Sequence, residues 1–100
     1  MSLKLMDGVE MNEKFPDTFE IPSNERKQMV ESGWYCKIGV YCADGNTERI
    51  WVQVTGHQNG KFIGTLANDP VLFPLKYEDV VEFSPCNILA ILSPQQGEGE

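Results

Sequence analysis

A change of period at Trp34 constrains the fold of this chain more than any other feature of its sequence. From that residue onward, every second position of the first run is apolar: Trp34, Cys36, Ile38, Val40 and Cys42. Side chains on a β-strand point alternately to its two faces, so this pattern predicts a half-buried strand over 34–42. The run 49–55 alternates in the same way and predicts the second strand of a hairpin.

The two runs also predict how these strands pair. Keeping aliphatic side chains opposite one another places Ile38 against Val52 and Val40 against Ile50. This register requires a loop with an odd number of residues, such as the three-residue loop 44–46 with a bulge. A two-residue turn would break the match between the aliphatic side chains, and we therefore expect the odd loop.

Several further strands follow, separated by turns. Asn59 and Gly60, within the turn 56–60, form the strongest hairpin signal in the chain, and Gly64 marks a kink or bulge in the third strand. The strands predicted after the first hairpin are 61–67, 71–73, 80–83 and 88–92. Five or six short strands with almost no helix predict a mainly β fold, either a small SH3-like antiparallel barrel or a curved sheet. An OB-type barrel is the second choice, because its usual helix between strands three and four has no sequence to occupy here.

The segments at the two ends are predicted to differ from the domain between them. Residues 1–18 show no sustained period and predict an irregular N-terminal arm that packs on a single β-barrel-like domain over 19–92. Residues 93–100 contain no apolar side chain, so a disordered acidic tail is expected there. One short helix is expected over 24–31, with Ser23 as its N-cap. This helix is expected to dock through two apolar residues, Met29 and Val30.

Composition excludes several classes of protein. The chain of 100 residues has eight Lys and Arg against fifteen Asp and Glu, which gives a formal net charge of −7. Nucleic-acid-binding domains normally present a basic face and anionic membranes attract basic segments, so we expect neither nucleic acid nor membrane as a partner. No run of about eighteen apolar residues is present to span a bilayer, and Asp7 interrupts the N-terminal residues before a signal peptide can form. We therefore expect a soluble, acidic, cytoplasmic protein.

Three cysteines, an odd number, favour reduced thiols over a disulfide framework in a chain without a secretion signal. Cys36 and Cys42 lie on one predicted strand, roughly 20 Å from each other. In an unbroken strand this separation excludes both a disulfide between them and a shared zinc ion. Cys86, in a Ser-Pro-Cys-Asn turn, is the best candidate for a reactive thiol, and no metal site is expected.

The sequence contains no pattern typical of an enzyme. His57, the single histidine, lies in a polar turn, and no serine is surrounded by the glycine pattern of a nucleophile elbow. Carboxylates are abundant, but none of their spacings is typical of paired acid–base catalysis. Phosphate-binding glycine motifs are also absent from the sequence. We therefore expect no catalytic residue, no metal and no cofactor.

Several segments of the sequence resemble a known family. The matching residues are 50–55 (IWVQVT), Gly60, 64–70 (GTLANDP), 75–76 (LK), 79–83 (DVVEF) and Ile88. Over residues 19–91 the chain resembles the YegJ-like bacterial family of domains of unknown function, which includes similar small phage and plasmid proteins. Members of this family usually have Gly-Asp before the last strand of the pattern, where this chain has Glu78-Asp79. The resemblance implies a compact β-rich domain and transfers no catalytic residue.

The aromatic residues of the first hairpin form the candidate interaction face. Tyr35, Tyr41 and Trp51 can share the face opposite the aliphatic one. An exposed aromatic face of this kind binds peptides or nucleic-acid bases on small barrels. Base stacking would require more neighbouring cations than Lys37 and Arg49, so a peptide is the better match.

Alternatives remain open for these residues and for Asp69. The N-terminal arm and the helix could cover the aromatic face and bury Trp51 against Phe19 or Met29. Asp69, in an Asn-Asp-Pro sequence, could serve only the turn, because Asp side chains bond neighbouring backbone amides and proline fixes the next φ. In the functional interpretation, Asp69 is a polar anchor for a partner.

These patterns predict a non-catalytic protein-interaction module that binds through its aromatic face or through an open sheet edge. The alternative draws on the acidity: an immunity or antitoxin-like protein, or a DNA mimic, that inhibits a basic partner protein. In both cases the partner is another protein, whose identity the sequence does not reveal. A homodimer through an unpaired edge strand is also compatible with the pattern.

Overall fold

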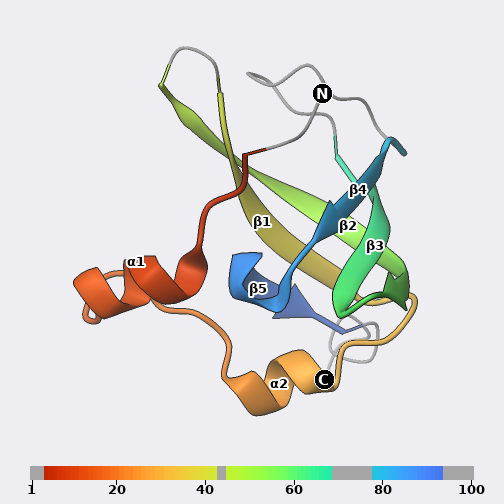
Figure 1. Cartoon of the computed structure of the whole chain (residues 1–100), viewed down its shortest axis with the longest axis horizontal. Coiled ribbons are helices and arrows are strands. Elements are labelled where there is room, and N and C mark those ends of the chain that lie inside the picture. The colour runs from red at the N-terminus through yellow and green to blue at the C-terminus, as the bar shows by residue number, and fades with distance from the viewer. Residues whose placement is uncertain (1–3, 43–44, 69–77, 94–100) are drawn as a thin grey trace.

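The computed structural model describes residues 4–42, 45–68 and 78–93. Five strands, two α-helices and one 3₁₀ helix are present in this part of the chain (Figure 1). The strands are β1 (Tyr35–Tyr41), β2 (Thr47–Gln58), β3 (Lys61–Leu66), β4 (Val80–Phe83) and β5 (Ile88–Leu92). The helices are α1 (Gly8–Lys14), α2 (Asn24–Gln28) and the 3₁₀ helix η1 (Pro85–Asn87). The predicted mainly β class is therefore confirmed.

The five strands form one antiparallel sheet in the order β4-β3-β2-β1-β5. The two ends of this order, β4 and β5, are connected along the chain by η1, so the sheet curves to bring them near each other (Figure 1). Among the described residues β4 and β5 are not paired with each other, and the sheet is open. The predicted strand 71–73 lies outside the described residues.

The pairing of β1 with β2 differs from the predicted register by two residues. Ile38 lies opposite Ile50 and Cys36 lies opposite Val52, whereas the aliphatic match predicts Ile38 opposite Val52. A shift of two residues keeps every side chain on its own face, so the aliphatic residues still meet on one side of the sheet. The predicted faces are confirmed, and the predicted register is wrong.

The loop of this hairpin explains the shift. The Cys42 N–H donates to the Asn46 carbonyl oxygen over 2.7 Å, so the loop between these two residues has the predicted odd length. Gly45 has a φ of +89°, in the left-handed region that favours glycine. The loop therefore ends at Gly45 instead of Asn46, and this shifts the pairing of the two strands by two residues from the predicted register.

The second hairpin confirms the Asn-Gly signal. Asn59 and Gly60 both have positive φ, 53° and 79°, and they connect the paired residues Gln58 and Lys61. This is the two-residue turn that matches the natural twist of a hairpin. The turn is narrower than the predicted 56–60, because β2 continues to Gln58.

Position 64 of β3 requires a glycine, because β3 packs closely against its neighbour β2 there. The pairing of the two strands shifts between Val54 and Gly56, immediately after the pair of Val54 with Gly64. A Cβ at Gly64 would collide with the carbonyl oxygen of Gln53 and with the side chain of Val52. The irregularity predicted at Gly64 thus lies on the neighbouring strand, which bends there and approaches the glycine closely.

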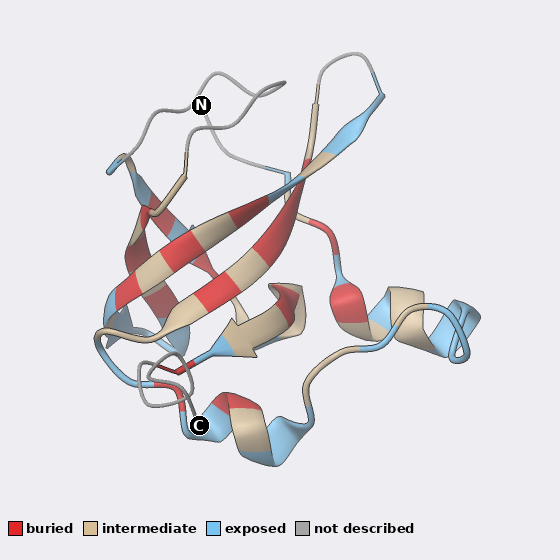
Figure 2. Cartoon of the chain, turned by 180° about the vertical axis from the view of Figure 1, so that it is seen from behind, coloured by how far each residue is buried: buried red, intermediate tan, exposed pale blue. Residues whose placement is uncertain are grey.

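The inward face of the sheet forms the hydrophobic core. Its buried strand residues are Cys36, Ile38, Val40, Ile50, Val52, Val54, Phe62, Leu66, Val81, Phe83 and Ile88. Phe62 and Phe83 pair across β3 and β4, with ring centroids 5.6 Å apart. Figure 2 shows buried and half-buried residues alternating along β1 and β2, as expected for strands with one covered face. The alternation that predicts the strands therefore predicts the core as well.

The N-terminal arm is not irregular throughout, because it contains α1. This helix begins after Asp7, whose side chain accepts a hydrogen bond of 3.0 Å from the Glu10 N–H. Gly8 is the buried residue of α1, and a Cβ there would approach the Leu89 side chain to 2.9 Å. A helix that docks through a glycine leaves no apolar stripe in the sequence, and this explains why its pattern does not predict it.

The second helix is shorter than predicted. Ser23 caps it as expected, since its hydroxyl oxygen accepts a backbone hydrogen bond of 3.1 Å from the first turn. The helix ends at Gln28, and of the two predicted docking residues only Val30 is buried. Val30 is 2% exposed, whereas Met29 is 55% exposed. Lys27 is buried on the side of the helix that packs against the fold.

Residues 4–6 extend the sheet on the same side of β1 as β5. The Met6 N–H donates to the Gly39 carbonyl oxygen at 2.8 Å, and the Tyr41 N–H donates to the Lys4 carbonyl oxygen at 2.9 Å. An isolated antiparallel bridge lies between these two bonds. Because β5 pairs with residues 35–38 and the arm pairs with the rest of β1, the arm and β5 lie end to end along the same edge of β1.

The turn before β4 places Glu78 in an unfavourable backbone conformation. This residue has a φ of +74°, a region where glycine is favoured over residues with a Cβ. Its N–H donates to the Leu66 carbonyl oxygen at 2.9 Å, and the Leu66 N–H donates to the Asp79 carbonyl oxygen at 2.9 Å. Glu78 and Asp79 thus form this turn at the cost of backbone strain that a glycine would avoid.

The first residue of the predicted disordered tail lies within the described part of the chain. Ser93 is buried at 3% exposure, although the disordered tail is predicted to begin there. The remainder of the predicted tail, 94–100, lies outside the described residues. Within the parts of the chain that the structure describes, no helix has the length and apolar character needed to cross a membrane.

Candidate functional site

The candidate site lies on the face of the sheet turned away from the core, which we call the outward face. Its positions on β1, on β2 before the bulge and on β5 are Tyr35, Lys37, Gly39, Tyr41, Thr47, Arg49, Trp51, Gln53, Ala90 and Leu92. Two of these residues are charged, and both are cations. The chain has fifteen acidic residues, yet none occupies these outward positions on the three described strands.

One end of the outward face contains an open cavity of about 220 Å³. Tyr35, Trp51, Ala67 and Leu92 line it, and we call these four residues the aromatic cavity. Tyr35 pairs directly with Leu92 on β5, while Trp51 lies diagonally across from Tyr35 on β2. Leu92 is 41% exposed, so the cavity presents an aliphatic side chain to solvent beside two half-buried aromatic rings.

Contacts from two directions hold Trp51 in place. Its backbone N–H donates to the Asn68 side-chain oxygen at 2.7 Å, and its carbonyl oxygen accepts from the Ala67 N–H at 2.9 Å. The Lys37 ammonium nitrogen lies 5.2 Å from the centroid of the Trp51 ring, within the range of a cation–π contact. Trp51 is therefore anchored through its backbone and through its ring.

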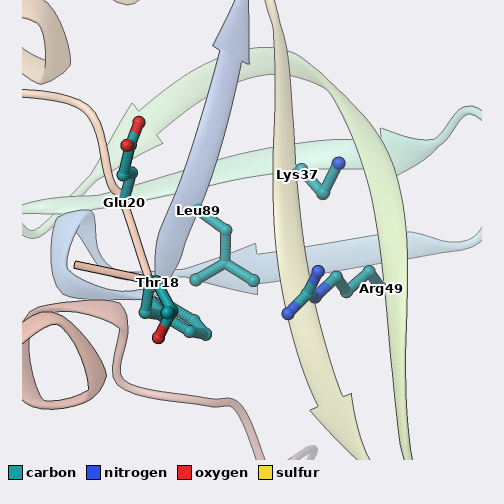
Figure 3. Close-up of a pocket in the computed structure, with 6 residues that line it drawn as sticks. Thr18, Glu20, Lys37, Arg49 and Leu89 are labelled. Carbon is teal, nitrogen blue, oxygen red and sulfur yellow. The ribbon is translucent and has the colours of Figure 1, made fainter. Parts of the chain in front are cut away.

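A second cavity, which we call the cationic cavity, lies beside the first and has a volume of about 160 Å³. Its lining residues are Thr18, Phe19, Glu20, Lys37, Arg49 and Leu89. Figure 3 shows Arg49 reaching from β2 across β1, while the Glu20 carboxylate points away from Arg49. The Arg49 guanidinium carbon lies 5.7 Å from the Phe19 ring centroid. Lys37 connects the two cavities, because it lines this one and stacks on Trp51 of the other.

The far end of the outward face is covered by the N-terminal arm. A Cβ at Gly39 would lie 3.2 Å from the Met6 Cβ and 3.4 Å from a Leu89 methyl carbon. Farther along β1, the Lys4 ammonium nitrogen lies 5.6 Å from the Tyr41 ring centroid. The outward face is thus divided into an arm-covered end at Gly39 and an accessible end at the aromatic cavity.

The structure brings together two of the four predicted interaction residues. Tyr35 and Trp51 share the aromatic cavity. Tyr41 lies at the opposite end of β1, about 20 Å along the strand from Tyr35. Asp69 lies outside the described residues, so neither its role in the turn nor its role as an anchor is tested.

The alternative in which Phe19 or Met29 covers Trp51 is not the arrangement that the structure shows. Phe19 packs against Arg49, and Met29 is exposed, so neither is the cover expected over Trp51. The sequence pattern also does not predict Leu92 as a member of the site. The register shift between β5 and β1 places Leu92 on the outward face, although Ile88, four residues earlier on the same strand, lies in the core. This pairing, which brings Leu92 to Tyr35, joins distant segments.

Cysteine and histidine side chains lie outside the two cavities. Burial in the core raises the pKa of the Cys36 thiol from 9.0 to about 12, because the core cannot solvate a thiolate. Cys42 and Cys86 are half-buried thiols. His57 lies on β2 instead of in the predicted turn, and its ring is 4.8 Å from the Phe62 ring. Among the described residues, no group of three metal-ligating side chains is present.

Comparison with known proteins finds no match to a family model, to a curated protein or to a solved structure. The resemblance to the YegJ-like family therefore stays a prediction.

Proposed function

We propose that this protein is a non-catalytic interaction module that binds a segment of another protein on its outward face. The observation that carries the proposal is the aromatic cavity, in which Tyr35 and Trp51 lie beside the exposed Leu92. Tyr and Trp are enriched in protein interfaces, because each combines a large apolar area with a polar group. The cavity has room for one apolar side chain of the partner.

The proposal extends to the finer features of the fold and to the location. We propose an SH3-like arrangement of the strands, supported by their order, by the bulge that bends β2 and by η1 between β4 and β5. The location that accompanies this proposal is the bacterial cytoplasm, as the resemblance to a bacterial family predicts.

A peptide-display selection tests the proposal. The wild-type protein and its Trp51→Ser variant are each used to select binders from a phage-displayed library of random peptides. We expect the wild type to enrich peptides that Trp51→Ser binds at least about tenfold more weakly, because a buried tryptophan carries a large share of an interface's energy. Tyr41→Ser is the matched control, since it removes an outward aromatic ring of the neighbouring strand β1 at the arm-covered end.

Two outcomes would contradict the proposal. In the first, the folded wild type enriches no peptide. In the second, Trp51→Ser, with its fold verified by near-ultraviolet circular dichroism, enriches the same peptides as the wild type. Loss of binding in Tyr41→Ser alone would indicate that the partner binds at the other end of β1.

A different observation favours the second candidate function, inhibition of a basic partner. Seven acidic residues before β1 are exposed: Asp7, Glu10, Glu13, Asp17, Glu20, Glu25 and Glu31. An immunity or antitoxin-like protein, or a DNA mimic, would use such a surface to attract a basic protein. Binding of this kind is lost at high salt and on replacing these acids with their amides, and it is unaffected by Trp51→Ser.

A further inference from the structure

We infer that the outward face recognises a partner segment in which an acidic side chain lies two residues from an apolar one. This inference rests on the proposed function and names the chemistry of the partner. The aromatic cavity takes the apolar side chain, and the cationic cavity takes the carboxylate. The occupant to which we commit is an extended segment of another protein.

The charges on the outward face favour a partner with an acidic side chain. Lys37 and Arg49 lie on a face whose outward positions on β1, β2 and β5 contain no acid, although the chain has a net charge of −7. Within the described residues neither of these two cations forms an ion pair. Each is instead oriented by an aromatic ring, Lys37 by Trp51 and Arg49 by Phe19. Oriented cations beside an apolar cavity form a site that suits a carboxylate.

The spacing of the two cavities matches the spacing of side chains along an extended peptide. Lys37 lies directly opposite Trp51 across the β1–β2 pair, and Arg49 is two residues from Trp51 along β2, a separation of about 7 Å. In an extended peptide, side chains two residues apart project to the same side and are also about 7 Å apart. An extended segment with an apolar residue, any residue and then an acid therefore reaches both cavities at once.

Glu20 is the acidic residue in the lining of the cationic cavity. Its carboxylate points away from Arg49, so it leaves the guanidinium accessible (Figure 3). As a charge of the same sign as the partner's acid, Glu20 still weakens the binding that we infer. Nucleic acid is a poorer occupant of these cations, because its many phosphates would be repelled by the exposed acids of the arm.

Three blocked tripeptides test the inference by NMR titration of the full chain. Acetyl-Leu-Ser-Glu-amide has the inferred spacing and charge, acetyl-Leu-Ser-Gln-amide lacks the charge, and acetyl-Leu-Glu-Ser-amide lacks the spacing. The readout is the indole N–H signal of Trp51, and that of Trp34, which packs against the core, is the internal control. We expect the first peptide to shift the Trp51 signal alone and to bind about tenfold more tightly than the other two.

Variants of the charged residues test which groups are responsible. Lys37→Met and Arg49→Met keep an apolar stem, and each should weaken binding of the Glu peptide by about threefold, which is more than it weakens binding of the Gln peptide. Glu20→Gln should strengthen binding of the Glu peptide. Lys61→Met is the matched control for the change in net charge, because Lys61 lies beside Glu82, outside both cavities.

The outcomes separate the inference from the proposed function. Equal binding of the Glu and Gln peptides would overturn the inference and leave the aromatic cavity as a docking site. A Trp51 signal that none of the three peptides moves would also overturn it. In either case the library selection with Trp51→Ser decides the proposed function independently, because it does not assume an acidic ligand.

Discussion

Strand β1 presents two faces that are stabilised in different ways. Cys36, Ile38 and Val40 point inward and are fully buried in one continuous cluster of aliphatic and aromatic side chains. Tyr35 and Lys37 point outward, are half-buried, and are each matched to particular neighbours across the strands. The comparison teaches that the inward face determines whether the chain folds, whereas the outward face determines what the folded chain can bind.

The largest expected difference between the faces is in their response to truncation. Ile38→Ala should lower the free energy of unfolding by about 3 kcal/mol, because buried methyl groups are lost and a cavity remains. Lys37→Ala, one residue away, should cost less than about 1 kcal/mol, because it removes a single cation–π contact. Urea unfolding of the two variants measures both values. Equal losses would break the comparison, since the outward face would then support the fold as strongly as the core.

Alanine substitutions at two glycines should change the stability by an intermediate amount and show which close contacts in the sheet matter. Gly64→Ala should destabilise the protein by about 2 kcal/mol, since the new Cβ would collide with the backbone of β2. Gly56→Ala is the control, because a Cβ there would meet no atom within 4 Å, and it should change stability by less than about 0.5 kcal/mol. Thermal unfolding distinguishes the two. A stable Gly64→Ala protein would show that β2 and β3 can separate there without cost.

The effect that is smallest near neutral pH is a pH dependence that belongs to the inward face. The Cys36 thiol has its ordinary pKa of 9.0 in the unfolded chain, and burial raises this pKa to about 12 in the folded one. The unfolded state therefore loses this proton first, so the contribution is intact below pH 9 and is lost as the pH rises toward 12. The expected slope is at most about 1.4 kcal/mol per pH unit.

Cys36→Ala isolates this slope from other groups that titrate in alkali. Stability is measured for both proteins by urea unfolding at several alkaline pH values, and the difference between the two curves should fall as the pH rises. Parallel curves would mean that the thiol is solvated in the folded state, in disagreement with its complete burial.

Alternation alone predicts most of the sheet and its inward face. The strands found as β1, β3, β4 and β5 match the predicted ones within one residue at each end, because the period of two is a property of the chain itself. The register of the first hairpin is not predicted, because aliphatic residues repeat along both strands and several alignments match them equally well. Gly45 decides between these alignments, through a single backbone conformation.

The candidate site is only half predictable for the same physical reason. Tyr35 and Trp51 belong to one hairpin, and their common face follows from local alternation. Leu92 and Phe19 reach this face through the pairing of β5 with β1 and through the path of the chain before β1, contacts between segments that are distant in the sequence. Helix α1 is unpredictable because its buried residue is a glycine, which gives no hydrophobic signal.

The arrangement of the arm and β5 on one side of β1 has a mechanical consequence. Residues 4–6 and β5 run in the same direction along β1, one after the other, so both ends of the folded chain are attached to a single strand. A force that pulls the two ends apart draws these segments along β1 in opposite directions. Their backbone hydrogen bonds are then strained together, in shear, instead of opening one after another as in a peeled hairpin. The molecule is therefore built to resist stretching along β1 more than peeling across it.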